Sequence, residues 1–345
     1  MELKTGSTFD TRCGPLQSFL MLANRVQSLT IVVTNRALCR EHFKLTLRCD
    51  AFPVTRPGQF IQVACRDLDR PMTATFEFDW PVDGPPAGAA PDLLAPAAML
   101  RRPFSLAGRR DTPAGVELDF IHRVVGVGTR WLEQLKPGDT CNVIGPIGNV
   151  FTPPAEGGIA LLVGGGVGIP PLIYLASILE GRKAVAFAGA TTRDLLSLTI
   201  TDAAPAPSVE SIHPLYNIEE FARHGIATIA CTDDGSYGYR GYVTEALEAY
   251  LDQWITDNAD RNRTIIYTCG PEPMMKRVVQ IAQRRNIACQ VCVERAMACG
   301  MGTCQSCCIK VKKPDPARPP LPGKEWCYRL ACTDGPIFPA DVLLW

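Results

Sequence analysis

The chain has 345 residues, with 35 basic and 35 acidic side chains and a formal net charge of zero at neutral pH. This length is too great for one ordinary hydrophobic core, so we expect two or three domains. The neutral and scattered charge gives no reason to expect a nucleic-acid partner or an anionic membrane surface.

Cysteine content and one apolar run bear on the cellular compartment. The sequence has fifteen cysteines and shows neither a basic region nor a cleavage site at its start, so we expect reduced thiols and a cytoplasmic location. Residues 159–179 are uncharged and apolar enough to suggest a membrane helix. Three consecutive glycines and Pro170-Pro171 interrupt this run. A buried strand, a glycine turn and a buried helix explain it better, and we expect no membrane association.

The first half of the chain predicts a barrel or sandwich. From about residue 28 to 150, short β-type runs alternate with turn signals. The predicted strands are 29–33, 43–47, 59–64, 116–122 and 140–144. An insertion at about 67–100 breaks this spacing. Its segment 81–98 is rich in Pro and Ala, which favours a surface position of unknown role.

Directly after the insertion stands the motif Arg102-Pro103-Phe104-Ser105. Arg offers a planar fork of donors for phosphate, Phe a flat surface, and Ser a hydroxyl for a ring nitrogen. The motif is therefore a candidate binding site for a cofactor. A turn that enters a strand is the alternative interpretation.

A second candidate site follows the predicted strand 116–122. Ile121-His122-Arg123 ends this strand, and Gly128-Thr129 stands where a helix could begin. The Thr129 hydroxyl and amide either cap that helix or hold a phosphate. His122 is interpreted as a packed or surface histidine in preference to an acid–base catalyst.

From about residue 157, apolar strands alternate with helices, which indicates a doubly wound parallel sheet. Strands are predicted at 159–163, 184–188, 227–230 and 264–268, and helices at 171–179, 244–254 and 274–285.

Two turns in this half could bind a dinucleotide. The first, between a strand and a helix, contains Gly164, Gly165, Gly166 and Gly168. Glycines let the backbone approach a pyrophosphate, and the helix N-terminus supplies amide donors. The turn lacks the third spaced glycine of the usual fingerprint, and no acid ends the next strand. A simple tight turn is the alternative interpretation.

The second turn also follows a strand and opens a helix. It contains Cys269, Gly270, Pro271 and Met274. Alone it could be an ordinary helix start. Together the two turns predict a ligand site at the carboxyl ends of parallel strands.

The C-terminal segment contains the most specific motif. Cys299, Cys304, Cys307 and Cys332 have the C-x4-C-x2-C…C spacing of a plant-type [2Fe–2S] cluster. Cysteine-based zinc sites usually contain two C-x2-C pairs, and only one such pair occurs here. Structural zinc and inert cysteines are the alternatives. A basic, Pro-rich loop of unknown role spans 310–324.

The order of these motifs resembles that of the ferredoxin–NADP reductase superfamily. The tail narrows the resemblance to the electron transfer subunits of the NAD-dependent bacterial dihydroorotate dehydrogenases. Its residues 294–307 and 328–338 carry this part of the resemblance, which covers about 28 to 340 in all. The insertion before Arg102 and the longer loop between Cys307 and Cys332 depart from the family pattern.

The resemblance implies a multidomain β plus α/β fold. Its parts are a six-stranded antiparallel β-barrel that binds FAD, a doubly wound parallel α/β domain that binds NAD, and a small C-terminal [2Fe–2S] domain. The implied boundaries are 1–27 for an N-terminal extension, 28–152 for the barrel, 157–288 for the α/β domain and 289–345 for the cluster domain.

The resemblance also implies site residues. The implied FAD contacts are Arg102, Pro103, Phe104, Ser105, Ile121, His122, Arg123, Gly128 and Thr129, and the implied cluster ligands are Cys299, Cys304, Cys307 and Cys332. Ser105 and Cys269 are expected in catalytic positions beside the flavin ring. Cys269 is expected near the flavin N5 without becoming a covalent nucleophile.

The implied function is electron transfer in pyrimidine biosynthesis. Electrons from dihydroorotate, on a separate FMN-containing catalytic subunit, would pass through the cluster and FAD to NAD⁺. The expected assembly is a heterotetramer of two subunits of each kind. This chain would be an oxidoreductase subunit without its own dihydroorotate site. The sequence does not decide between NAD and NADP, since Arg193 could meet a 2′-phosphate or face water.

Other functions remain open at this point. A subunit of a bifurcating ferredoxin–NADP oxidoreductase would have an aspartate in place of Cys299. A hydrogenase-associated diaphorase subunit is possible on this sequence. A self-contained oxygenase reductase would need more residues before the first cluster cysteine. A cluster-based redox-sensing module belongs to a different functional class.

Overall fold

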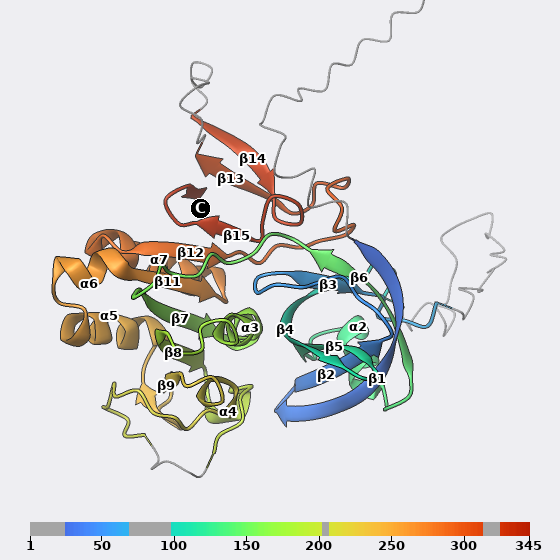
Figure 1. The fold of residues 1–345 in the computed structure, drawn as a ribbon, viewed down its shortest axis with the longest axis horizontal. Helices are drawn as coiled ribbons and strands as arrows, with labels where there is room; N and C mark the ends of the chain where they lie inside the picture. Colours follow the sequence, from blue (N-terminus) through green and yellow to red (C-terminus); the bar gives the residue numbers. More distant parts are fainter. Residues whose placement is uncertain (1–24, 69–97, 202–206, 313–324) are drawn as a thin grey trace, which may run out of the picture.

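The structure is a computed structural model that describes residues 25–68, 98–201, 207–312 and 325–345. Within these ranges the strands form a closed barrel, a seven-stranded sheet and a three-stranded sheet (Figure 1). The interpretation of 81–98 as a surface insertion and most of the 310–324 loop lie outside the described residues.

The barrel consists of six antiparallel strands, as the family resemblance implied. Its closed order is β1-β2-β5-β4-β3-β6. The strands are β1 (Val26–Cys39), β2 (His42–Cys49), β3 (Phe60–Val63), β4 (Arg102–Thr112), β5 (Gly115–Arg123) and β6 (Thr140–Ile147). One helix, α2 (Val127–Gln134), lies between β5 and β6. Alternate side chains such as Leu45, Leu47 and Phe120 fill the barrel interior and are fully buried.

The seven-stranded sheet has the order β10-β9-β8-β7-β11-β12-β15. The strands are β7 (Ile159–Gly165), β8 (Lys183–Ala190), β9 (Ala227–Thr232), β10 (Tyr239–Arg240), β11 (Thr264–Cys269), β12 (Ala288–Cys292) and β15 (Ile337–Pro339). All neighbouring pairs are parallel except β12 and β15. The sheet therefore continues into the C-terminal segment, because its last two strands lie there.

Helices cover both faces of this sheet, as in a doubly wound fold (Figure 1). The helices are α3 (Pro170–Ala176), α4 (Glu219–Ala222), α5 (Val243–Trp254), α6 (Asn258–Arg263) and α7 (Glu272–Arg285), with short 3₁₀ turns η2 (Gly166–Gly168) and η3 (Arg193–Leu195). Residues of α5 and α7 share one hydrophobic core with Leu161 and Val163 of β7. Residues of α3 and α4 share another with Ala160 and Leu162, which alternate with the first pair along the strand.

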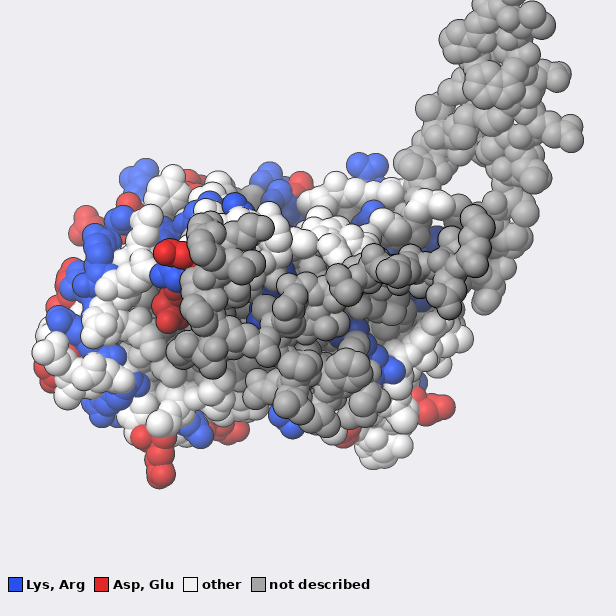
Figure 2. Space-filling model, turned by 90° about the horizontal axis from the view of Figure 1, so that it is seen from above, with Lys and Arg blue, Asp and Glu red and all other residues white. Residues whose placement is uncertain are grey.

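The apolar run 159–179 forms β7, η2 and α3, as the glycines and prolines predicted. In the part of the chain that the structure describes, no helix has both the length and the apolar character needed to cross a membrane. Figure 2 shows basic and acidic side chains interspersed on the visible face where it is not drawn in grey.

The C-terminal segment adds a small antiparallel sheet of order β14-β13-β16. Its strands are β13 (Cys308–Lys312), β14 (Trp326–Leu330) and β16 (Leu343–Leu344). Asn149, between the barrel and β7, binds this segment. Its side-chain Nδ2 donates to the carbonyl oxygens of Asp334 at 3.0 Å and Ile337 at 2.8 Å. Its Oδ1 accepts from the Ile337 amide at 2.8 Å.

One buried carboxylate lies in the barrel wall. Asp119 on β5 is 2 % exposed and accepts a hydrogen bond from the Thr46 hydroxyl at 2.8 Å. It forms ion pairs with Arg110 at 2.6 Å and Lys44 at 3.0 Å. Burial alone would raise the pKa of Asp119, but these partners outweigh burial and lower its pKa. The ionised form therefore stabilises the fold above the ordinary carboxyl pKa, and this stability is lost as pH falls through the lowered pKa.

We predict that Asp119→Ala destabilises the protein by about 3 kcal/mol at neutral pH, because it leaves Lys44 and Arg110 without their shared carboxylate. The urea midpoint measured at pH 7 checks this. The difference from wild type should shrink in acid, where the wild-type carboxyl is protonated. Asp111→Ala is the control, since Asp111 is exposed and pairs only with Arg109 among the described residues. Equal midpoints for wild type and Asp119→Ala at pH 7 would contradict the prediction.

Candidate functional site

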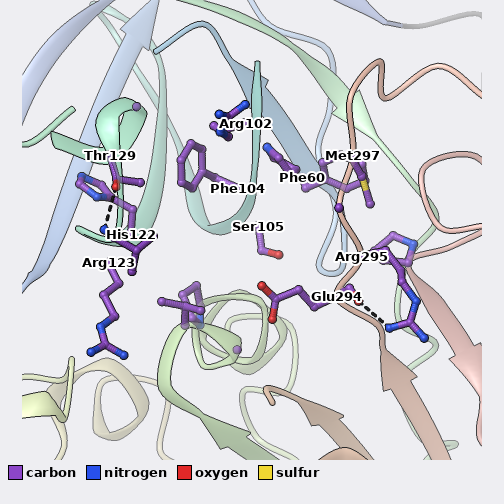
Figure 3. A pocket seen from close by; sticks show the side chains of 18 of the residues that line it. Phe60, Arg102, Phe104, Ser105, His122, Arg123, Thr129, Glu294, Arg295 and Met297 are labelled. Atoms are coloured by element: carbon purple, nitrogen blue, oxygen red, sulfur yellow. Dashed lines mark hydrogen bonds between the residues drawn. The ribbon is translucent and has the colours of Figure 1, made fainter. Parts of the chain in front are cut away.

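A cavity of about 1000 Å³ lies where the barrel, the large sheet and the C-terminal segment meet. Its lining comes from all three parts. The lining includes Phe104 and Ser105 of β4, His122 of β5, Thr129 of α2, Gly168 and Cys269 of the large sheet, and Met297, Ala298 and Ser306 of the C-terminal segment. Figure 3 shows Ser105 and Glu294 pointing into this cavity from the barrel side and from the segment after β12. Residues predicted from three distant motifs are thus brought together.

The Arg102–Ser105 motif is the first part of strand β4, so it is not a mere turn before a strand. The pairing of β4 with β3 sets Ser105 opposite Phe60, and both residues line the cavity. Phe104 stacks on Phe120 with ring centroids 4.8 Å apart, which leaves one face of its ring toward the cavity. Pro103 and Arg102 line the same wall.

His122 is buried against this wall with 1 % exposure. Neither ring nitrogen has a hydrogen-bond partner among the described residues. Burial, with a smaller effect from His42, lowers the pKa of His122 to about 4. The ring is therefore neutral at physiological pH and offers a ligand one donor and one acceptor. Neighbouring Ile121 and Arg123 also line the cavity, and Arg123 pairs with Glu41 at 2.9 Å.

Thr129 caps helix α2 with its side chain. The hydroxyl oxygen accepts from the amides of Val125 at 2.9 Å and Gly126 at 3.1 Å. This contact fixes the loop before α2 as part of the cavity wall. Gly128 is buried on the same helix, and a Cβ there would lie 3.1 Å from Cβ of Cys65. The glycine lets α2 pack closely on the barrel.

The two backbone turns predicted to bind a dinucleotide lie against each other. They end the neighbouring parallel strands β7 and β11, where Gly164 pairs with Cys269. A Cβ at Gly168 would come within 2.4 Å of the Cys269 carbonyl, so only glycine allows this approach. Gly270 contacts Gly165 in the same way, with a hypothetical Cβ 3.0 Å from the Gly165 carbonyl oxygen.

A second cavity of about 670 Å³ extends from these turns along the carboxyl edge of the sheet. Its lining includes Gly165, Gly166, Pro271, Met274, Asp233, Glu245, Arg123 and Glu294. Arg123 and Glu294 line both cavities, so the two are adjacent. Gly164 instead packs against Leu172 of α3.

Sequence reasoning missed three acids of these cavities, Asp233, Glu245 and Glu294. It looked for an acid after the second strand of the α/β domain, but Asp233 follows the third strand in sequence, β9, which neighbours β8. Burial, followed by Asp234 and Glu245, raises the pKa of Asp233. Glu294 was noted only as part of the tail motif. Arg193 stacks on Tyr237, with its guanidinium carbon 5.6 Å from the ring centroid.

Cys269 has a second thiol beside it. Cys292 of β12 pairs directly with Cys269 of β11, so both side chains point to the same face, and both line the larger cavity. The hydrogen bond with Cys292, followed by burial, raises the pKa of Cys269 well above its ordinary value. Cys269 is therefore a protonated thiol at neutral pH.

The four motif cysteines lie on two segments that meet beside the larger cavity. The amides of Met301 and Cys304 approach Cys299 Sγ at 3.3 and 3.4 Å. Gly300 and Gly302 have φ of 69° and 87°, which glycine adopts without strain. Cys304 lies beside Cys299, and Cys332 lies beside both Cys307 and Cys299.

Within the described ranges, no three His, Cys, Asp or Glu side chains already surround one common point as a metal site would. The donor set nevertheless fits a cluster, because four thiols and backbone donors to sulfur are gathered in adjacent loops. The spare Cys308 donates a hydrogen bond to the Gln305 carbonyl at 2.9 Å.

Comparison with known proteins identifies the parts. Residues 294–344 match the family described as the iron-sulfur cluster binding domain of dihydroorotate dehydrogenase B. Residues 162–280 match the oxidoreductase NAD-binding domain. A solved structure of an NADH-dependent reduced ferredoxin-NADP oxidoreductase superposes with a TM-score of 0.64 and 25 % identity, and it covers 92 % of this chain and 90 % of that chain.

Two similar relatives are both named dihydroorotate dehydrogenase B (NAD(+)), electron transfer subunit. The one from Geobacillus thermodenitrificans is 32 % identical over 91 % of this chain and 96 % of its own length. The one from Bacillus caldolyticus is 36 % identical over 71 % of this chain and 80 % of its own length. The extent of these matches, together with the barrel, the sheet and the cysteine segment around one cavity, shows that the chain belongs to the family of electron transfer subunits of dihydroorotate dehydrogenase B.

Proposed function

We propose that this chain relays electrons from a dihydroorotate-oxidising partner subunit to NAD⁺, using a [2Fe–2S] cluster and FAD, in pyrimidine biosynthesis. The observation that carries the proposal is the shared cavity. Ser105 from the barrel, Cys269 from the sheet, and Ala298 and Ser306 beside cluster cysteines all line it. Residues that would hold the flavin and the nicotinamide therefore line one cavity, and the neighbours of the cluster cysteines form part of its wall.

The residues fit these groups by their chemistry. FAD would be held by the barrel wall, where Phe104 offers a ring face and His122 has two unpartnered nitrogens among the described residues. NAD would be held by the two glycine turns. Cys299, Cys304, Cys307 and Cys332 would hold the cluster. When bound, a flavin exchanges two electrons with nicotinamide and single electrons with an iron–sulfur cluster.

Three other side chains of the cavity orient the reactants without reacting with them. Ser105 presents a hydroxyl to the cavity, where it can donate to a ring nitrogen. The raised pKa of Cys269 keeps its sulfur protonated, so it positions a ring without attacking it. The lowered pKa of His122 keeps that ring neutral. This chain therefore supplies binding and orientation, and dihydroorotate chemistry belongs to the partner.

We further propose that the partner carries FMN, that two copies of each subunit assemble, and that the complex is cytoplasmic. Every described cysteine is a free thiol, which supports a reducing compartment. To test the partner, the full chain is purified from its native cells and the companion protein is identified. We expect an FMN-containing protein, and NAD⁺ reduction by dihydroorotate only when both proteins are present. A hydrogenase or ferredoxin-dependent companion would overturn this assignment.

The cysteine assignment has a matched pair of variants. Cys304→Ser should lose the paramagnetic signal of the reduced cluster and most of its iron, because one ligand is removed. Cys308→Ser changes a neighbouring thiol that donates a hydrogen bond to a backbone carbonyl. This variant should keep both the paramagnetic signal and the iron. Iron content and electron paramagnetic resonance after dithionite reduction measure the effect. Loss of the signal in Cys308→Ser but not in Cys304→Ser would show that the ligands are wrongly assigned.

We propose that Asp233 selects NAD over NADP. Its carboxylate lines the smaller cavity and would accept from a ribose hydroxyl but repel a 2′-phosphate. Asp233→Ser should raise the ratio of kcat/KM for NADPH over NADH by at least about tenfold, or about 1.4 kcal/mol.

The control is Asp234→Ser. The Asp234 carboxylate accepts hydrogen bonds from the Ser236 amide at 2.9 Å and from its hydroxyl at 2.6 Å, so it is engaged within its own turn. This variant should leave the preference close to wild type. An unchanged preference in Asp233→Ser would remove Asp233 as the selecting residue.

A further inference from the structure

A glutamine of the barrel lies buried beside the cluster loop. Gln62 on β3 is 1 % exposed, and its Oε1 and Nε2 have no hydrogen-bond partner among the described residues. Its carboxamide lies against Gly300, which follows the first cluster cysteine. A Cβ at Gly300 would be 2.7 Å from Gln62 Nε2. Leaving such a buried amide unpaired costs stability, so a ligand of the holoprotein is expected to pair with it.

A guanidinium reaches the same glycine from another element. Arg25 Nη1 donates to the Gly300 carbonyl at 3.4 Å. The Arg25 Nε is buried and has no partner within the described ranges. Burial lowers the pKa of Arg25, and the nearby Cys332 and Cys299, one from each segment of the cluster site, oppose this shift. Gln62 and Arg25 thus place an amide donor and a positive charge beside the same loop.

The potential of an iron–sulfur cluster depends on net charge and on hydrogen bonds to its sulfurs. Reduction adds an electron to an already anionic group, so nearby N–H donors and cations stabilise the reduced form. Second-shell groups of this kind also orient the ligands of a metal site.

We propose that Gln62 and Arg25 hold the reduction potential of the cluster higher than the four cysteines alone would, by donating to its sulfurs and by placing a positive charge beside them. This inference rests on the proposed cluster ligation, and it assigns the two residues a tuning role that none of the four ligands performs.

The test is a redox titration of the purified, cluster-containing full chain, followed by electron paramagnetic resonance. In Gln62→Met the ratio of reduced to oxidised cluster at a fixed potential should fall about tenfold, which is about 59 mV for one electron. The side chains have similar length and shape, so packing against Gly300 is retained.

Gln59→Met is the matched control on the neighbouring turn. Gln59 is also buried, but its carboxamide already pairs with the Arg56 amide at 2.9 Å and the Gly148 carbonyl at 3.1 Å. This variant should keep the wild-type potential. A fall in Gln59→Met equal to that in Gln62→Met would show a general packing effect and overturn the proposal.

Two variants test whether the positive charge of Arg25 raises the cluster potential. Arg25→Gln should lower the reduced-to-oxidised ratio several-fold, whereas Arg25→Lys, which keeps the positive charge, should restore most of it. Unchanged midpoints in both Gln62→Met and Arg25→Gln, with a normal cluster signal, would overturn this inference alone. If the wild-type chain gave no cluster signal at all, both the proposed ligation and the inference would fall.

Discussion

The side chain of Asn149 joins the three parts of the molecule. It stands in the short link between β6 and β7, and it forms three side-chain hydrogen bonds with the backbone of residues 334–337. Its own amide donates to Gly335 at 2.7 Å. These residues come directly after Cys332 in the chain. One asparagine therefore holds the segment of the last cluster cysteine against the junction of the barrel and the sheet.

This attachment explains why one cavity can serve several redox groups. Electron transfer between bound groups needs them to be held close, and a cavity walled by all three parts brings their binding residues together. The strands contribute in a complementary way. The carboxyl ends of β7 and β11 bring two backbone turns to the cavity, and β12 with β15 extends the same sheet to the cysteine segment. The strand order therefore places the two backbone turns and the cysteine segment beside the same cavity.

Two titratable side chains of the larger cavity are uncharged at neutral pH. The pKa of His122 falls and that of Cys269 rises, so neither the ring nor the thiol carries a charge at neutral pH. The carboxylates of Asp233 and Glu294 line the smaller cavity instead. A site without a charged nucleophile suits a protein that orients cofactors and leaves proton transfer on substrate to a partner.

Much of this arrangement could be predicted from local patterns. Alternating barrel strands, the glycine turn, the helices on both sheet faces and the cysteine spacing are properties of contiguous segments. Short strands such as β15 were not predicted, because three residues carry too little periodicity and its partner β12 lies some forty residues away in sequence. Asp233 was missed because only the strand order shows which loop lies beside the glycine turns. Gln62 shows no pattern at all, since its role depends on a loop more than two hundred residues later.

The proposed relay requires that electrons from NADH reach both the flavin and the cluster in this one chain. An anaerobic titration of the purified full chain with NADH, followed by flavin absorbance and electron paramagnetic resonance, measures this. We predict that the flavin bleaches and that a reduced-cluster signal appears. Bleaching with no cluster signal at any point, in a sample whose cluster dithionite does reduce, would contradict the relay.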